Sequence, residues 1–172
     1  YMGAMIIAPF LLERRWGFRP TIIGLLMLPR PLAFAIAAKL GGTHDLDRGA
    51  RRVSMTGCLV FATAMLIAGV GAQQKWLVVF ILGAGLAGAG SGYIRATIAN
   101  TTTLAAGDQD LGVAGGSLNM LQMVGGTVGI TLATAMLGTS TSGSRFMAIH
   151  LAAGITALLA AFLAARIKEP TE

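Results

Sequence analysis

Apolar residues follow one another in long runs along this chain, and short polar segments separate the runs. The runs are continuous rather than alternating, which favours helices over strands and argues against a β-barrel. A helix needs about 20 apolar residues to cross a hydrocarbon core of roughly 30 Å. By that length the pattern predicts one partial and five complete spans, at about residues 1–12 (partial), 21–40, 53–72, 77–99, 111–137 and 146–165.

The residues at the ends of these runs fit a membrane boundary. Trp16, Phe18 and Trp76 lie beside charged or polar segments, and amphipathic rings prefer the interface between water and lipid. The polar segment 41–52 is expected to be a turn between two spans. The pattern therefore predicts an all-α fold, a polytopic transmembrane helical bundle whose surroundings are a lipid bilayer.

Composition agrees with a membrane protein and narrows the range of functions. Of 172 residues, 55% are hydrophobic and 12% are charged, and the mean hydropathy is +0.73, values too apolar for an ordinary soluble domain. The formal net charge of +6 comes from basic residues between apolar runs. These residues form no basic stripe, so no nucleic-acid partner is predicted. Cys58 is expected to be a small core residue, and two histidines far apart suggest no metal site.

The span at 111–137 combines small residues with amides. Its glycines and amides recur at steps of three and four, which places them on one helix face: Gly112, Gly115, Asn119, Gln122, Gly126 and Gly129. One interpretation is helix packing, in which glycines let a neighbouring backbone approach and the amides bond across helices. The other is a ligand cavity, because Gln122 lies roughly 15 Å from the start of the span, near the depth where transporters bind substrates.

Arg30 is a cation near the middle of its span, about ten residues from either end. At that depth a guanidinium costs about 3 kcal/mol or more unless it faces protein or water. Pro29 and Pro31 flank it and are expected to bend the helix. Arg30 therefore either faces a substrate pathway or forms a structural ion pair, or its side chain snorkels toward the membrane surface, which the bend would make easier. No acidic residue lies inside a complete span, so a partner would come from a loop, another segment or a substrate.

Three other polar residues receive simpler interpretations. Arg95 lies near the far end of its span, where a long side chain reaches the headgroups. His150 lies one turn inside its span and is expected to be an interfacial residue with a local hydrogen bond rather than a proton relay. His44 is expected to be solvated among the loop charges.

The segment GAGLAGAGSG, residues 83–92, is rich in glycine. It lacks the Gly-Lys-Ser/Thr that completes a phosphate-binding loop and lies inside a span, so Gly88 and Gly92 are expected to serve helix packing. The chain shows no Ser/His/Asp, Cys/His or paired-carboxylate arrangement within the spans. No catalytic residue is therefore assigned, and no enzyme is predicted.

The segment GGTHDLDRGARRV, residues 41–53, resembles the cytoplasmic loop signature of the major facilitator superfamily. In that signature glycine, an Asp-Arg pair, glycine and two basic residues follow in short order. The matching residues are Gly42, Gly49, Arg51 and Arg52, and the pair Asp47-Arg48 is displaced by one residue so that it abuts Gly49. LLMLPRPLAFAIAAKLGG and DLGVAGGSLNMLQMVGGTVGI look like the second and fifth helices of the carboxy-terminal half of the 14-span drug/proton antiporter group.

The resemblance implies that residues 1–172 form a six-helix half of the major facilitator fold with a truncated first helix. It implies that the loop charges lock neighbouring helices in one conformational state. It places residues 41–52 and the C-terminus in the cytoplasm and the protein in the plasma (inner) membrane. Counts of basic residues on the two sides, six against five, hardly decide the orientation by themselves.

The same resemblance implies that Arg30, Asn119 and Gln122 line a cavity between two halves that rock. The partner would be a missing amino-terminal half, which would carry the antiporter signature and the proton-binding acids. No cofactor is expected beyond a proton gradient. The chain opens at Tyr1 without an initiator methionine or a recognisable signal peptide, and we expect it to belong to a longer protein.

Three functions remain open from the sequence. The leading hypothesis is the carboxy-terminal half of a proton-coupled exporter of hydrophobic or cationic small molecules. The second is a major facilitator permease for a metabolite, in which Arg30 holds an anionic group. The third is a non-transporting membrane module that assembles with a partner, and a membrane-embedded enzyme is the least favoured.

Overall fold

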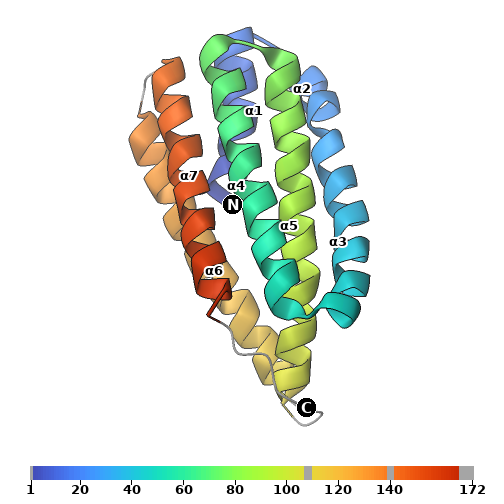
Figure 1. Ribbon diagram of the computed structural model, residues 1–172. Helices are drawn as coiled ribbons and strands as arrows, with labels where there is room; N and C mark the ends of the chain where they lie inside the picture. The colour runs from blue at the N-terminus through green and yellow to red at the C-terminus, as the bar shows by residue number, and fades with distance from the viewer. Residues whose placement is uncertain (1, 107–109, 139–141, 167–172) are drawn as a thin grey trace.

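The computed structural model describes residues 2–106, 110–138 and 142–166, and within these ranges the chain is a helical bundle without strands (Figure 1). The prediction of an all-α helical bundle is confirmed. The helices are α1 (Met2–Trp16), α2 (Pro20–Met27), α3 (Pro29–Arg48), α4 (Ala50–Gln74), α5 (Leu77–Ala106), α6 (Leu111–Leu137) and α7 (Gly143–Ala164).

Helix α5 occupies the centre of the bundle. It packs along its length against α3 on one side and α4 on the other, and α7 packs against the far side of α4 (Figure 1). Helix α6 makes its main contact with α1 and touches α5 and α7 less extensively. The four helices α3, α5, α4 and α7 therefore form a continuous layer, and α1 and α6 form a second pair beside it.

Glycines on α5 bring its backbone directly against α3. A Cβ at Gly88 would run into the backbone carbonyl of Arg30, and a Cβ at Gly92 would run into that of Phe34. Helices in lipid gain little from burying apolar groups against one another, so close van der Waals contact carries more of their association. The two glycines lie one turn apart and set the distance between α5 and α3.

Five segments of the described chain are long and apolar enough to cross a membrane. They are Pro20–Asp45, which joins α2 and α3, and then Ala50–Gln74, Leu77–Leu104, Leu111–Leu137 and Gly143–Ala164. Five candidate membrane-spanning segments therefore lie where hydropathy predicted complete spans. Helix α1 has 15 residues with Pro9 inside it and is not among the five, in keeping with the predicted partial span.

Helices α2 and α3 are separated by a break at Leu28, as the flanking prolines predicted. Helix α2 ends at Met27 and α3 begins at Pro29. Neither Pro29 nor Pro31 has a backbone N–H to donate to the preceding turn. The carbonyl of Leu25, which residue 29 would bond in a regular helix, accepts from Leu28 N–H at 3.2 Å. The helical path is interrupted beside Arg30.

The expected turn at residues 41–52 is helical instead, which corrects the boundary read from hydropathy. Helix α3 continues to Arg48, and only Gly49 separates it from α4. Gly49 has φ +81°, a left-handed conformation that glycine adopts without steric cost. Hydropathy indicates where a segment is apolar enough for lipid. A helix continues past that point when its polar residues are hydrated or bonded to other residues.

Two other boundaries move outward for the same reason. Helix α1 runs through the charged residues to Trp16, and α5 reaches Ala106 rather than stopping near residue 99. The lower ends of α5 and α6 accordingly extend past the connection between α3 and α4 (Figure 1).

Replacing Gly92 by alanine is expected to lower the free energy of unfolding of the protein by about 1–3 kcal/mol, the usual cost of overpacking. The added Cβ would meet the Phe34 carbonyl, which cannot move aside as a flexible side chain can. The matched control is Gly85→Ala on the same helix, where the new Cβ would lie 3.8 Å from the Cβ of Pro29, in ordinary contact. Unfolding in detergent by heat or denaturant measures both variants, and equal stability would contradict the close approach.

Candidate functional site

Arg30 lies inside the bundle, in the first turn of α3. Its side chain is only 6% exposed, and its backbone carbonyl packs on Gly88 of α5. At about 1.5 Å per residue it is roughly 15 Å from Pro20 and 22 Å from Asp45, the two ends of its span. A side chain that snorkels along the lipid surface would be exposed, so the geometry is that of an inward-facing guanidinium.

His150 of α7 lies in the same interior and is 2% exposed. Its Nδ1–H donates to the backbone carbonyl of Phe146 at 2.7 Å, which is the local hydrogen bond expected from the sequence. Its ring meets the Phe80 ring edge-on at 6.1 Å. His150 therefore packs against Gly69 of α4 and Phe80 of α5 inside the bundle, and its expected depth near the membrane boundary stays a prediction.

The stripe of glycines and amides on α6 divides into two parts. At its C-terminal end Gly126 and Gly129 face α1, with a Cβ at Gly126 lying 3.2 Å from Cγ of Met2 and one at Gly129 lying 3.8 Å from N of Gly3. Toward the N-terminal end, Cβ atoms at Gly112 and Gly115 would meet nothing within 4 Å among the described residues. Only the C-terminal part of the stripe packs on another helix of this chain.

Gln122 is joined to α5 by a hydrogen bond of the kind that the helix-packing interpretation expected of the amides, although its partner was not predicted. Arg95 Nη1 donates to Gln122 Oε1 at 2.8 Å, so Arg95 has a partner within the protein as well as access to its surroundings. Asn119, one turn earlier on α6, is exposed. The two amides and the guanidinium lie on the part of α6 that is otherwise uncovered.

The bond joins Gln122 to a part of α5 that lies toward the end of the α3 span. Asn100 Nδ2 donates to Asp45 Oδ2 at 3.2 Å, and Asp45 is where the α3 span ends. Arg95 is five residues before Asn100 on α5, which is about 7.5 Å along the helix. Arg95 therefore lies toward that end of the bundle, whereas Gln122 lies 11 residues inside the α6 span Leu111–Leu137, and the depth expected for Gln122 stays a prediction.

A second pair of residues fastens α3 to α5 at the same end. His44 Nδ1 and the Tyr93 hydroxyl are 2.8 Å apart, and their rings meet edge-on at 5.9 Å. His44 is half-buried in α3 rather than solvated in a loop. The sequence did not predict these contacts, nor the bond between Asp45 and Asn100, because each joins residues of two helices. The only signal within one helix is that Tyr93 and Asn100 are seven residues apart and so share one face of α5.

The residues of the loop signature surround the helix break. Gly49 makes the break, and a Cβ at Gly42 would lie 3.8 Å from the Cβ of Ala96. Arg51 and Arg52 are exposed in the first turn of α4. The side chains of Asp47 and Arg48 lie outside what the structure describes, so their expected locking role stays a prediction.

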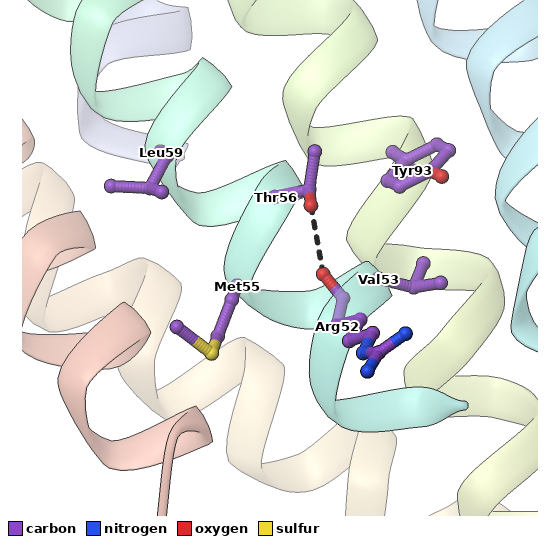
Figure 2. A pocket seen from close by; sticks show the side chains of 6 residues that line it. All are labelled: Arg52, Val53, Met55, Thr56, Leu59 and Tyr93. Atoms are coloured by element: carbon purple, nitrogen blue, oxygen red, sulfur yellow. Dashed lines mark hydrogen bonds between the residues drawn. The ribbon is translucent and has the colours of Figure 1, made fainter. Parts of the chain in front are cut away.

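An open groove of about 490 Å³ begins beside this break (Figure 2). Residues of α4 form most of its wall, and Tyr93 closes it from α5. Its lining consists of Arg52, Val53, Met55, Thr56, Leu59 and Tyr93. None of the predicted pathway residues Arg30, Asn119 and Gln122 belongs to this lining. Over the described ranges no three metal-ligating side chains lie together, and Cys58 is a free, buried core residue, as expected.

The chain is similar to two curated proteins, both named Multidrug resistance protein Stp, from two strains of Mycobacterium tuberculosis. Each is 25% identical to it over 135 residues, which is 78% of this chain. The matched region makes up 25% of the length of each relative, so the chain spans about a quarter of the length of the curated relatives it matches. No protein-family profile and no solved structure matches the chain. The five apolar spans and this similarity fit a multi-pass membrane protein.

The hydrogen bond between Arg95 and Gln122 is expected to couple the two residues energetically. A double-mutant cycle with Arg95→Met and Gln122→Met should give a coupling of about 1 kcal/mol, the range found for hydrogen bonds between membrane helices. The control cycle pairs Arg95→Met with Asn119→Leu, which should be additive because no bond joins those side chains in the described structure. Unfolding of the complete protein in mixed micelles supplies the free energies, and additivity in both cycles would contradict the bond.

Proposed function

We propose that this chain is the carboxy-terminal membrane half of a secondary active transporter of the multidrug efflux type, built as a major facilitator half of the 14-span group. The observation that carries the proposal is the similarity to a multidrug resistance protein over 78% of the chain, in a protein with five apolar spans. Transport is proposed to proceed by alternating access, with a proton gradient as the energy source and hydrophobic or cationic small molecules as substrates.

Unequal coverage of the spans supports the existence of a partner half. In α4, 56% of the residues in the most apolar stretch of the helix are buried within the chain. The buried share is 11% for the α2–α3 span and 17% for α6. We propose that α3 and α6 face the amino-terminal half. The open glycines and the exposed Asn119 on α6 would then be covered by that half or line the cavity between the halves. Residues 41–52 and the C-terminus are proposed to be cytoplasmic, in the plasma membrane.

Arg30 is proposed to act in the substrate pathway through its position beside the α2–α3 break. A buried guanidinium next to an interrupted helix is held in place yet lies where the backbone can change. The loop residues around Gly49 are proposed to hold α3, α4 and α5 in one conformational state. The existing bonds from His44 and Asp45 to α5 support this role, because they would have to break for α3 to separate from α5.

A permease for an anionic metabolite is the second candidate, and Arg95 favours it. A guanidinium bonded to Gln122, with Asn119 exposed one turn away, offers several N–H donors suited to a carboxylate or phosphate. This arrangement would serve anion binding directly, whereas an exporter of cations would need carboxylates from the partner half.

The variant Arg30→Leu in the complete protein is expected to insert normally but to lose at least about 90% of transport, because one inward cation of the pathway is removed. Efflux of a hydrophobic dye and uptake of labelled anions are both measured in cells, with surface expression as the check on folding. Loss of dye efflux supports the exporter, and loss of anion uptake supports the permease. The control Arg14→Leu changes an exposed arginine at the end of α1 and should leave transport unchanged. Unchanged transport in Arg30→Leu would reject the pathway role.

Residues 1–172 expressed alone are expected to give no dye efflux, and co-expression with the amino-terminal part of the complete protein is expected to restore it. The reason is that a cavity between two halves needs both. Cells expressing the complete protein provide the reference activity. Efflux by residues 1–172 alone would contradict the half-transporter assignment, and absence of transport by the complete protein would favour a non-transporting membrane module.

A further inference from the structure

The groove beside Arg52 continues along the outer face of α4 into a second groove. The second groove lies between α4 and α7 and has a volume of about 110 Å³. Leu59 lines both, so the two meet at this side chain. From α4 the second groove is walled by Leu66, and from α7 by Leu151, Ile155 and Leu158. Together the two grooves form a depression along α4 that starts at a basic residue and continues between mainly aliphatic side chains, with Thr56 and Thr63 among them.

The end of this depression beside Arg52 attracts anions. Arg51 and Arg52 occupy the first turn of α4, which contains no acidic residue. The partial positive charge of a helix N-terminus is unfavourable for cations, so both arginines add to a positive potential that the turn itself does not balance. Figure 2 shows Arg52 and Leu59 at opposite ends of the groove, with Tyr93 on the wall formed by α5. The bond from Tyr93 to His44 holds that wall in position.

The remainder of the depression has the length and polarity of a lipid tail. Arg52 and Leu66 are 14 residues apart on α4, which is about 21 Å of helix. One leaflet of a bilayer has a hydrocarbon thickness of about 15 Å. The wall beyond Leu59 is formed by aliphatic side chains from two helices that pack together. An acyl chain that starts at the boundary marked by Arg52 would lie in this groove along its whole length.

We propose that this depression binds one anionic phospholipid, with its phosphate at Arg52 and an acyl chain across Leu59 toward Leu66. Any apolar groove on a membrane protein is filled by lipid, so the specific content of the proposal is the choice of headgroup. A basic residue at one end and an apolar path of leaflet length distinguish an anionic phospholipid from a free anion and from a neutral lipid. The site lies on the outer face of α4 and α7 and does not depend on which compound is transported.

The test is retention of phosphatidylglycerol or phosphatidylcholine with identical chains by the purified, delipidated complete protein, counted by native mass spectrometry. Arg52→Gln is expected to lower the preference for phosphatidylglycerol about fivefold, as expected for one basic residue near a membrane surface, and Arg52→Lys should keep most of it. Arg166→Gln is the matched control, because Arg166 is exposed beyond the end of α7 and stacks on Phe162 at 5.2 Å. It should change the preference less than about twofold.

A second variant tests the tail. Leu59→Trp fills the point where the grooves meet, at a side chain that is 47% exposed and so tolerates enlargement. Leu59→Trp is expected to reduce the retention of phosphatidylglycerol and of phosphatidylcholine several-fold, while the preference for phosphatidylglycerol stays unchanged. An equal loss in Arg166→Gln and Arg52→Gln, or no effect of Leu59→Trp, would overturn the proposal in favour of diffuse charge attraction. Displacement of the lipid by inorganic phosphate alone, or a second copy of the chain bound instead of lipid, would overturn it as well.

Discussion

The close contact of α5 with its two neighbours is the constraint on which the rest of the bundle depends. Gly88 and Gly92 let α3 approach until backbone meets backbone, and small residues such as Ala87 lie in the core shared with Phe61 and Met65 of α4. Larger side chains at the two glycines would push α3 outward. The burial of Arg30 follows from this contact, since its own backbone rests on Gly88. Packing of small residues therefore makes it possible to keep a cation inside an apolar bundle.

The same contact explains why the chain is covered so unevenly. Helices α4 and α5 are the best-covered spans because each has a helix packed on both sides, whereas α6 is held by α1 only at its C-terminal part, through Gly126 and Gly129. The N-terminal part of α6 keeps glycines and an amide on a surface with few neighbours. Polar groups in hydrocarbon carry a cost, so this surface is better suited to protein or to an aqueous cavity than to lipid. That reasoning favours a larger assembly over a complete bundle of this chain alone.

The number and place of the spans could be predicted from the sequence, and so could the break at Leu28, because length, hydropathy and proline act locally. The helix ends could not, since Thr43 and His44 remain helical past the lipid boundary through contacts with the backbone and with α5. That Arg95 is the hydrogen-bond partner of Gln122 could not be predicted from the sequence either. The bond joins residues 27 apart whose meeting depends on how α5 and α6 pack, and a residue pattern within one helix contains no such information.

The charges of this chain limit what it could contribute to the proposed transport. Arg30 lies in the interior, Arg95 of α5 bonds to Gln122 on the open part of α6, and the one acidic residue of the five described spans, Asp45, lies at the very end of its span and bonds to Asn100. In a low-dielectric site the two guanidinium groups repel cations and favour anions. In the proposed transporter, this chain would supply shape, amide donors and positive charge to the cavity between the halves. Recognition of a cationic compound, and any carboxylate that carries protons, would then have to come from the other half, whereas an anionic compound would find its counter-charge in these residues.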